Sequence, residues 1–333
     1  MYNSHILINE DGFLVANTEY KGLVAFYLKK NHVWEEKKWY EFNKQYVFKN
    51  KPSSGVFSVR FFFKDNEGVI TIYDTDNYAY SSENKLLFNI NNEGTVLKEA
   101  EDYKITYYNR DSTITFITFN GTKTTKKDVP FGFNLAMSNG WNLISVAQDN
   151  DTQYQGLSLE DFYEAVSPVI VNKDVYAYGA SLGGYCALYF GGCINATIIA
   201  GAPKNSAHSS INLDRFQNLN FSHGEFSTIP TTTKPVYIVY DSTLKSDSMF
   251  IENCISLAYP SANFLTIENG THIILQTMLN AGVLKLYIDS IVNREYSDDI
   301  SYYVKAKCKF FQGKDKEAFT ILEGVVKKKL YLR

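Results

Sequence analysis

Histidine and cysteine are scarce in this chain of 333 residues, with five and four copies. The cysteines, Cys186, Cys193, Cys254 and Cys308, form no Cys-x-x-Cys pair and have no regular spacing, which argues against a zinc knuckle or a disulfide framework. We therefore expect free thiols and a cytoplasmic location. No His-Glu-x-x-His sequence occurs either, so we expect no metal site. A mechanism that needs a histidine base has only five residues to choose from.

The chain also lacks a long apolar run and an excess of one charge. Its N-terminal segment has no basic stretch followed by an apolar one, so it does not resemble a secretory signal. No uncharged apolar segment approaches the roughly 20 residues that cross a bilayer. The 33 basic and 36 acidic residues leave a net charge of −3, which argues against nucleic acid as a partner. Phosphate-binding and dinucleotide-binding glycine motifs are missing, so we expect no resident cofactor.

What the chain does have is length and apolar residues, at 45% hydrophobic, enough for two domains or one large domain. Residues 24–28, 55–63 and 68–73 are rich in aromatic and β-branched residues and are separated by short polar turns. They predict a small antiparallel β-sandwich over residues 1–101. The 25 Tyr and 23 Phe residues fit a sugar-stacking surface or a simple compositional habit. We interpret this accessory domain as a scaffold.

From residue 102 the pattern changes to strands that alternate with helices. Strands are predicted at 112–119, 141–146, 174–178, 196–200, 236–240 and 263–267, with helices after Ser158 and Ser181. This alternation predicts an α/β domain over 102–295, with a mostly parallel sheet covered on both faces. Residues 296–333 carry apolar positions at helical spacing on both sides of Gly313, which predicts a helical hairpin.

The most specific motif lies at residues 179–183, which read Gly-Ala-Ser-Leu-Gly between a predicted strand and a predicted helix. A serine on such a tight turn needs small residues two positions before and after it. Gly179 and Gly183 meet that need, and the turn exposes the Ser181 hydroxyl at a helix N-terminus. In this context the chain resembles the α/β-hydrolase superfamily of serine esterases and acyltransferases. The resemblance covers residues 102 to 290 and implies that Ser181 is a nucleophile.

The resemblance also implies a histidine base later in the chain than Ser181, which leaves His208, His223 and His272. His272 follows a predicted strand directly and precedes a helix, so we expect it at the carboxyl edge of the sheet, beside Ser181. The other two lie in a polar insertion between residues 203 and 233. We assign His272 as the base and expect His208 to contact substrate at the pocket border.

The acid that orients the histidine should follow the strand at 236–240, where two carboxylates qualify. Asp241 lies at the strand end, and Asp247 lies six residues further on, inside the loop. We favour Asp247, because the superfamily places its acid a few residues beyond the strand. Asp241 remains the alternative, and whichever residue is not the acid can cap the turn with its carboxylate.

Two further groups complete the expected site. The oxyanion hole should use the Leu182 amide and a second amide after the strand that ends at residue 119, from Asn120 or Gly121. The loop at residues 148–154 should line one wall, with Tyr154 contacting a hydroxylated substrate.

These residues predict serine-dependent acyl transfer on an ester, resolved by water in an esterase or by a hydroxyl in an acyltransferase. A β-sandwich ahead of a hydrolase-like domain is similar to bacterial polysaccharide O-acetyltransferases. That resemblance implies a carbohydrate or other small ester as substrate, and a donor such as acetyl-CoA if the protein is a transferase. The alternative is a catalytically inactive hydrolase fold that serves as a binding or assembly protein.

Overall fold

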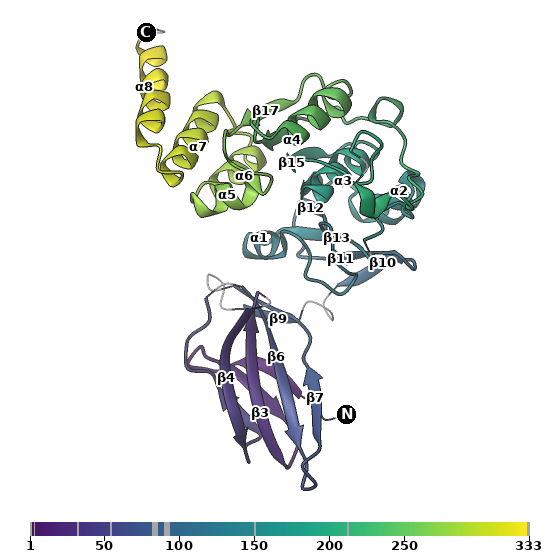
Figure 1. Cartoon of the computed structure of the whole chain (residues 1–333), viewed down its shortest axis with the longest axis vertical. Coiled ribbons are helices and arrows are strands. Elements are labelled where there is room, and N and C mark those ends of the chain that lie inside the picture. The colour runs from purple at the N-terminus through teal and green to yellow at the C-terminus, as the bar shows by residue number, and fades with distance from the viewer. Residues whose placement is uncertain are drawn as a thin grey trace.

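The computed structural model describes residues 2, 4–31, 33–53, 55–81, 86–89, 94–149, 151–211 and 213–331. Figure 1 shows a β-rich N-terminal part below a mixed α/β part, with the last two helices, α7 and α8, to one side. The prediction of a mixed α/β protein with a mostly parallel sheet is confirmed.

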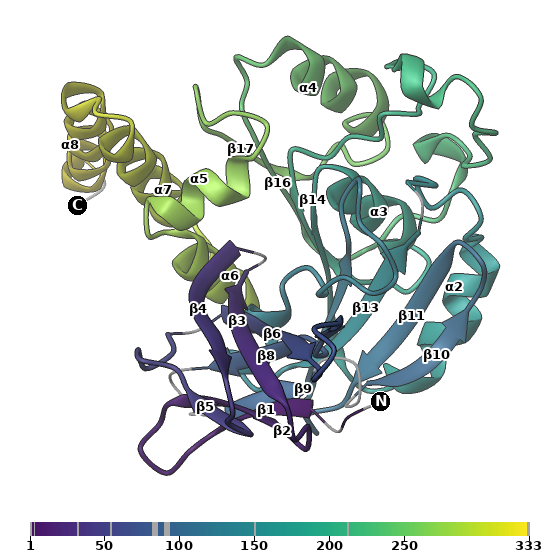
Figure 2. The ribbon, with the colours of Figure 1, turned by 60° about the horizontal axis from the view of Figure 1, so that its bottom comes forward.

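The N-terminal part contains two antiparallel sheets that share one apolar core. Strand β6 shows why, since its residues alternate between buried and half-buried along most of the strand, with Phe57, Val59 and Phe61 pointing inward. Phe26 and Leu14 meet them from the other strands. One sheet has the order β1-β2-β5, and the other has the order β4-β3-β6-β8-β9 with β7 also beside β6 (Figure 2). The strands are β1 (Ser4–Ile8), β2 (Leu14–Thr18), β3 (Leu23–Lys30), β4 (Val33–Glu41), β5 (Gln45–Val47), β6 (Gly55–Lys64), β7 (Ile70–Asp74), β8 (Tyr78–Ser81) and β9 (Leu86–Asn89).

The α/β part is built on one eight-stranded sheet with the order β10-β11-β13-β12-β14-β15-β16-β17. The first two strands pair antiparallel, and every pair from β13 onward is parallel. Its first strand precedes the boundary predicted at residue 101. The strands are β10 (Thr95–Glu99), β11 (Tyr103–Tyr108), β12 (Ile114–Phe119), β13 (Asn142–Gln148), β14 (Asp174–Ala180), β15 (Thr197–Gly201), β16 (Val236–Tyr240) and β17 (Asn263–Thr266).

Helices cover both faces of this sheet, because neighbouring strand residues point to opposite sides. Phe116 and Tyr176 pack in one core with α1, α5, α6 and α7, whereas Ile117 and Ala177 pack in another with α2, α3 and α4. The helices are α1 (Phe133–Ser138), α2 (Leu159–Val166), α3 (Leu182–Gly191), α4 (Lys245–Phe250), α5 (Ile274–Asn280), α6 (Leu284–Val292), α7 (Asp298–Phe311) and α8 (Asp315–Tyr331). Short helical turns are η1 (Ser167–Val169), η2 (Asp214–Phe216), η3 (Phe226–Thr228) and η4 (Ile251–Ile255).

The two parts of the chain touch at helix α1. Val56 from β6 is buried in the same core as Phe133 and Met137 of α1, and strand β8 also contacts this helix. Figure 1 shows α1 at the side of the α/β part that faces the N-terminal sheets. This contact brings N-terminal residues near the carboxyl edge of the parallel strands.

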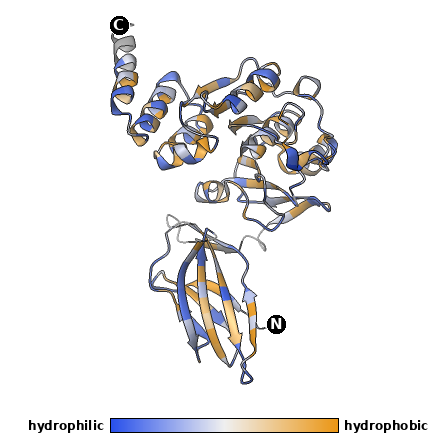
Figure 3. Cartoon of the chain, viewed as in Figure 1, coloured by the Kyte–Doolittle hydropathy of each residue, from blue (hydrophilic) through white to orange (hydrophobic). Residues whose placement is uncertain are grey.

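The distribution of apolar residues follows the packing. Figure 3 shows hydrophobic and hydrophilic positions alternating along the N-terminal strands. Trp34, Trp39 and Phe42 nevertheless stay exposed on β4 and just after it. In the described part of the chain, every helix is too short or too polar to cross a bilayer. The four cysteines all lie in that part and form no disulfide.

Candidate active site

Ser181 lies on a strained turn between β14 and α3. Its backbone has φ 53° and ψ −119°, a conformation that non-glycine residues rarely adopt. A Cβ atom on Gly179 would lie 2.1 Å from the Gly183 carbonyl oxygen, and one on Gly183 would lie 2.4 Å from the Phe119 carbonyl oxygen. Because neither neighbour is a flexible side chain, only glycine fits at both positions.

Backbone hydrogen bonds hold this turn in place. The Ser181 amide donates to the Gly201 carbonyl of β15 at 2.8 Å, and the Lys204 amide donates to the Ser181 carbonyl at 3.1 Å. Leu182 is the first residue of α3, so its amide has no acceptor within the helix. The Ser181 hydroxyl therefore lies at the positive end of a helix, where negative charge is stabilised.

His272 connects the serine to a carboxylate. It lies between β17 and α5, with its Nε2 2.7 Å from Ser181 Oγ and its Nδ1 2.6 Å from Asp247 Oδ2. An ionised carboxylate only accepts hydrogen bonds, so Nδ1 carries the proton and Nε2 accepts the hydrogen of the serine hydroxyl. This arrangement is suited to removing a proton from Ser181.

Asp247 lies in the first turn of α4 and is fully buried. Burial raises its pKa, but hydrogen bonds from His272 and Lys204 outweigh this effect and hold the pKa below its usual range. The Lys204 ammonium is 2.7 Å from Asp247 Oδ1, on the other oxygen from the histidine. Asp247 is thus a buried carboxylate that stays ionised and accepts hydrogen bonds from the side chains of His272, Lys204 and Ser246.

Asp241, the alternative acid, has a different set of partners. Its Oδ1 accepts from the Thr243 amide, the Thr243 hydroxyl and the Asn269 amide, while its Oδ2 accepts from the Thr271 amide at 2.9 Å. Burial raises its pKa, and these hydrogen bonds outweigh burial and lower it. The structure brings Asp247 to His272, whereas Asp241 ties its own turn to the loop that carries His272.

The two residues expected to supply the second amide of the oxyanion hole, Asn120 and Gly121, differ in their surroundings. The Asn120 amide already donates to the Val146 carbonyl at 3.1 Å, which leaves Gly121 as the candidate of the pair. The Asn120 side chain accepts from the Phe131 amide at 2.8 Å and so braces the rest of this loop. Phe131 and Gly132, rather than Asn120 or Gly121, are among the described residues that line the cavity beside Ser181.

Two predicted substrate contacts need correction. Tyr154 is fully buried, and its hydroxyl lies 2.9 Å from both the Asn120 and Val146 carbonyl oxygens, so it serves packing rather than substrate. His208 is 5% exposed, its Nδ1 contacts Ser210, and it is outside the described lining of the cavity. The loop at residues 148–154 does not contribute to that lining either.

His223, the third histidine after Ser181, is also a packing residue. Its ring stacks on Tyr189 with centroids 4.2 Å apart, and Nε2 donates to the Tyr154 carbonyl at 3.0 Å. Burial lowers its pKa to about 4, with the Tyr154 hydrogen bond acting in the opposite direction. It is therefore neutral near pH 7.

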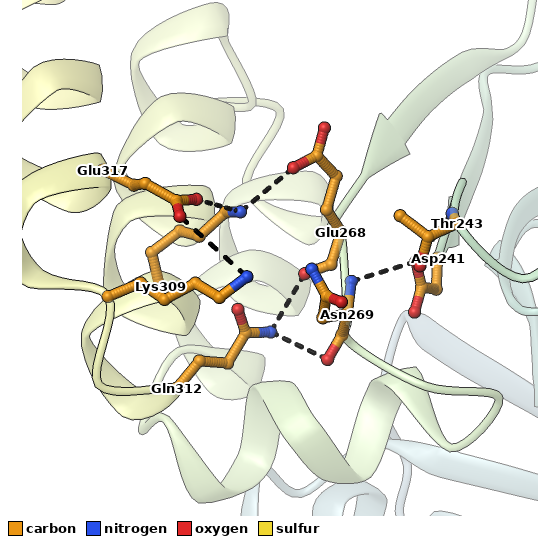
Figure 4. A network of polar contacts seen from close by, with 8 residues as sticks. Asp241, Thr243, Glu268, Asn269, Lys309, Gln312 and Glu317 are labelled. Carbon is orange, nitrogen blue, oxygen red and sulfur yellow. Dashed lines mark hydrogen bonds and ion pairs between the residues drawn. The ribbon is translucent and has the colours of Figure 1, made fainter.

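Residues from the C-terminal helices support the loop that carries His272, and the sequence analysis did not identify them. Figure 4 shows Lys309 of α7 between Glu268 and Glu317, and Gln312 reaching the loop backbone. Gln312 Nε2 donates to the carbonyl oxygens of Glu268 and Asn269 at 3.1 and 3.0 Å. Lys309 is 6% exposed, so its ammonium depends on these two carboxylates.

Lys204 was also not identified from the sequence. The available signal was its place three residues after β15, at the edge of the sheet where parallel strands end. Lys309 and Gln312 carried no such signal, because their partners in the loop that carries His272, Glu268 and Asn269, are more than 40 positions away.

A cavity of about 540 Å³ opens beside Ser181 and His272. Helices α1, α5 and α6 contribute to its walls, together with Tyr178 and Ala180 of β14. The volume lies within the range typical of small-molecule sites. Across the described residues, no group of three or more His, Cys, Asp or Glu side chains is arranged to hold a metal ion.

Comparisons with known proteins do not indicate a function, so the functional argument rests on the geometry of this site. No family model and no curated protein matches the chain. Among solved structures, the chain is similar to one described as a capsule O-acetyltransferase of Neisseria meningitidis serogroup A, at 14% sequence identity and a TM-score of 0.40. The match covers 59% of this chain and 93% of that chain. A TM-score this low carries no argument about fold or activity.

Proposed function

We propose that this protein is a serine-dependent acyl-transfer enzyme with a sheet of the α/β-hydrolase type. The observation that carries the proposal is the chain of short hydrogen bonds from Asp247 through His272 to Ser181. The strained turn at Ser181 and the strand order with an antiparallel start support it further. A nucleophile, a base and an orienting acid in contact are the arrangement that acyl transfer requires.

In the proposed reaction Ser181 Oγ attacks the carbonyl carbon of an ester or a thioester. His272 Nε2 takes the hydroxyl proton as the bond between Oγ and carbon forms, and the carbonyl oxygen becomes an oxyanion beside the Leu182 amide. The tetrahedral intermediate collapses, the bond to the leaving atom breaks, and His272 delivers its proton to that atom, which is the oxygen of an ester or, with acetyl-CoA as donor, the sulfur of the thioester. Ser181 is then acylated, and the same steps in reverse transfer the acyl group to water or to another hydroxyl.

Asp247 has the role of orienting acid in this proposal. It holds the proton of His272 on Nδ1, which leaves Nε2 free to accept the serine proton. It also stabilises the imidazolium that forms during the reaction. Lys204 shares the same carboxylate and so tempers its negative charge.

The acceptor and donor belong to the proposal as well. We propose a carbohydrate hydroxyl or water as acceptor, with a donor such as acetyl-CoA in the transferase case. Incubating the protein with acetyl-CoA and candidate oligosaccharides distinguishes the two outcomes, because transfer yields acetylated sugar and hydrolysis yields free acetate alone.

Ester turnover tests the proposal. Wild-type protein should hydrolyse p-nitrophenyl esters, whereas Ser181→Ala and His272→Ala should each lose about three orders of magnitude or more in kcat. A folded wild-type protein that turns over no ester would contradict the proposal and favour the inactive binding protein. Equal activity in wild type and Ser181→Ala would exclude Ser181 as the nucleophile.

A further inference from the structure

The cavity beside Ser181 has a chemical character that the proposed reaction does not by itself require. Most of its lining is apolar, contributed by Phe131 and Leu135 near α1, Leu275 and Leu279 on α5, and Leu284 on α6. Polar groups are fewer, and one of them, the Lys285 ammonium, already donates to Asn139 and Asp289. Asn134, Ser138 and Gln276 also line the cavity, but a sugar held against its apolar walls would leave part of its hydroxyl groups without hydrogen-bond partners, which is costly.

The apolar surface continues from the cavity to the outside of the protein. Ile273, next to His272, is 64% exposed, and Leu279 is 55% exposed. Large apolar side chains that remain exposed together beside a cavity mark a surface that binds apolar ligands. The cavity and its rim are therefore one apolar surface that begins at Ser181.

The N-terminal part of the chain also contributes to the lining. Tyr80 of β8 lines the cavity together with residues of the α/β part, and Val56 of β6 is buried in the same core as helix α1. The N-terminal sheets thus contribute to the shape of the cavity.

We propose that this cavity binds the acyl chain of the substrate, and that acyl groups of about four to eight carbons are transferred faster than acetyl, so that acetyl-CoA is the short member of the accepted donors. This inference rests on the proposed function, because in an acyl-enzyme the carbonyl carbon is bonded to Ser181 Oγ. The carbon chain must then extend from Ser181 into whatever space adjoins it. The adjoining space is apolar and, at about 540 Å³, larger than a methyl group needs.

A series of p-nitrophenyl esters with acyl chains of two, four, six and eight carbons tests this proposal. Each added methylene that enters the cavity should raise kcat/KM by roughly fourfold, from the free energy of burying one such group. A flat or falling series would overturn the inference. If only the p-nitrophenyl acetate ester is hydrolysed, the chain-length inference alone fails. The absence of any turnover would contradict the proposed function itself.

A pair of leucine variants tests where the acyl chain binds. Leu279→Gln places a polar group of similar size on the cavity wall, and it should fold because Leu279 is already half exposed. It should lower the ratio of octanoate to acetate kcat/KM by about tenfold. The matched control is Leu257→Gln, at a leucine that is 75% exposed and outside the described lining of the cavity; it should leave both rates unchanged. An unchanged ratio in Leu279→Gln would place the acyl chain elsewhere.

Discussion

The ion pair between Lys204 and Asp247 determines how much negative charge faces His272. Removing the lysine charge should therefore change the pH dependence of the reaction in a direction that can be stated in advance. Lys204→Met takes away the ammonium 2.7 Å from Asp247 Oδ1. The carboxylate is fully buried and then retains His272 and Ser246 as its side-chain partners. The variant carboxylate should stabilise a protonated imidazole more strongly than the wild-type carboxylate does.

The size of the effect follows from the positive charge that is removed. At about 7 Å and an effective dielectric constant of about 20, one unit charge changes the free energy of the imidazolium by about 2 kcal/mol, and one pH unit corresponds to about 1.4 kcal/mol. His272 must be neutral to accept the serine proton. Stabilising its protonated form therefore moves the acid limb of the kcat/KM profile upward, by about one to two pH units.

The assay is kcat/KM for a p-nitrophenyl ester between about pH 4 and 10, with Lys204→Arg as the control that keeps the positive charge. Thermal denaturation of each variant shows whether it is folded under the assay conditions. The arginine variant should keep a profile close to wild type. A folded Lys204→Met protein whose acid limb moves by less than about 0.3 pH units would refute the reasoning.

Three further predictions, made with four substitutions, test separate parts of the structure. Asp247→Asn should lower kcat by about four orders of magnitude, and Asp241→Asn by tenfold or less, in the same ester assay; the reverse order would reassign the acid. Burial holds the pKa of His223 at about 4, below its unfolded value of about 6.5. The unfolded state therefore binds the proton first, and stability that is full above pH 6.5 should fall by about 3 kcal/mol as the pH drops to 4. Urea titrations of the His223→Phe variant should show a smaller loss of stability over this pH range than wild type shows. An equal loss would show that His223 is not the group responsible. Lys309→Met, which loosens the loop that carries His272, should lower kcat by about tenfold with little change in KM; an unchanged kcat would show that Lys309 does not position the histidine.

The parts of the site that depend on local sterics and chain order could be predicted from the sequence. Gly179 and Gly183 are needed within one turn of five residues, so their pattern identified the position of Ser181. His272 and the choice of Asp247 came from what the resemblance to the α/β-hydrolase superfamily implies, applied to the predicted order of strands and loops, and the sheet reproduces that order. Whether these residues have the predicted catalytic roles is left to the experiments.

The parts that depend on distant contacts could not be predicted. Tyr154 follows a polar loop and looked suited to a hydroxylated substrate, but its hydroxyl reaches two backbone carbonyls of the core. Lys309 and Gln312 support the loop around Glu268 from helix α7, and no periodicity links such positions. The apolar cavity also escaped prediction, because its walls come from elements separated by more than a hundred residues.

The central claim is that Ser181 is an activated nucleophile, and covalent labelling tests it most directly. The protein is incubated with a fluorophosphonate, and the modified residue is located by mass spectrometry of the digested protein. The account predicts one label per chain, on Ser181, with none on Ser181→Ala and much slower labelling of His272→Ala. A folded wild-type protein that takes no label, or a label that persists in Ser181→Ala, would contradict it.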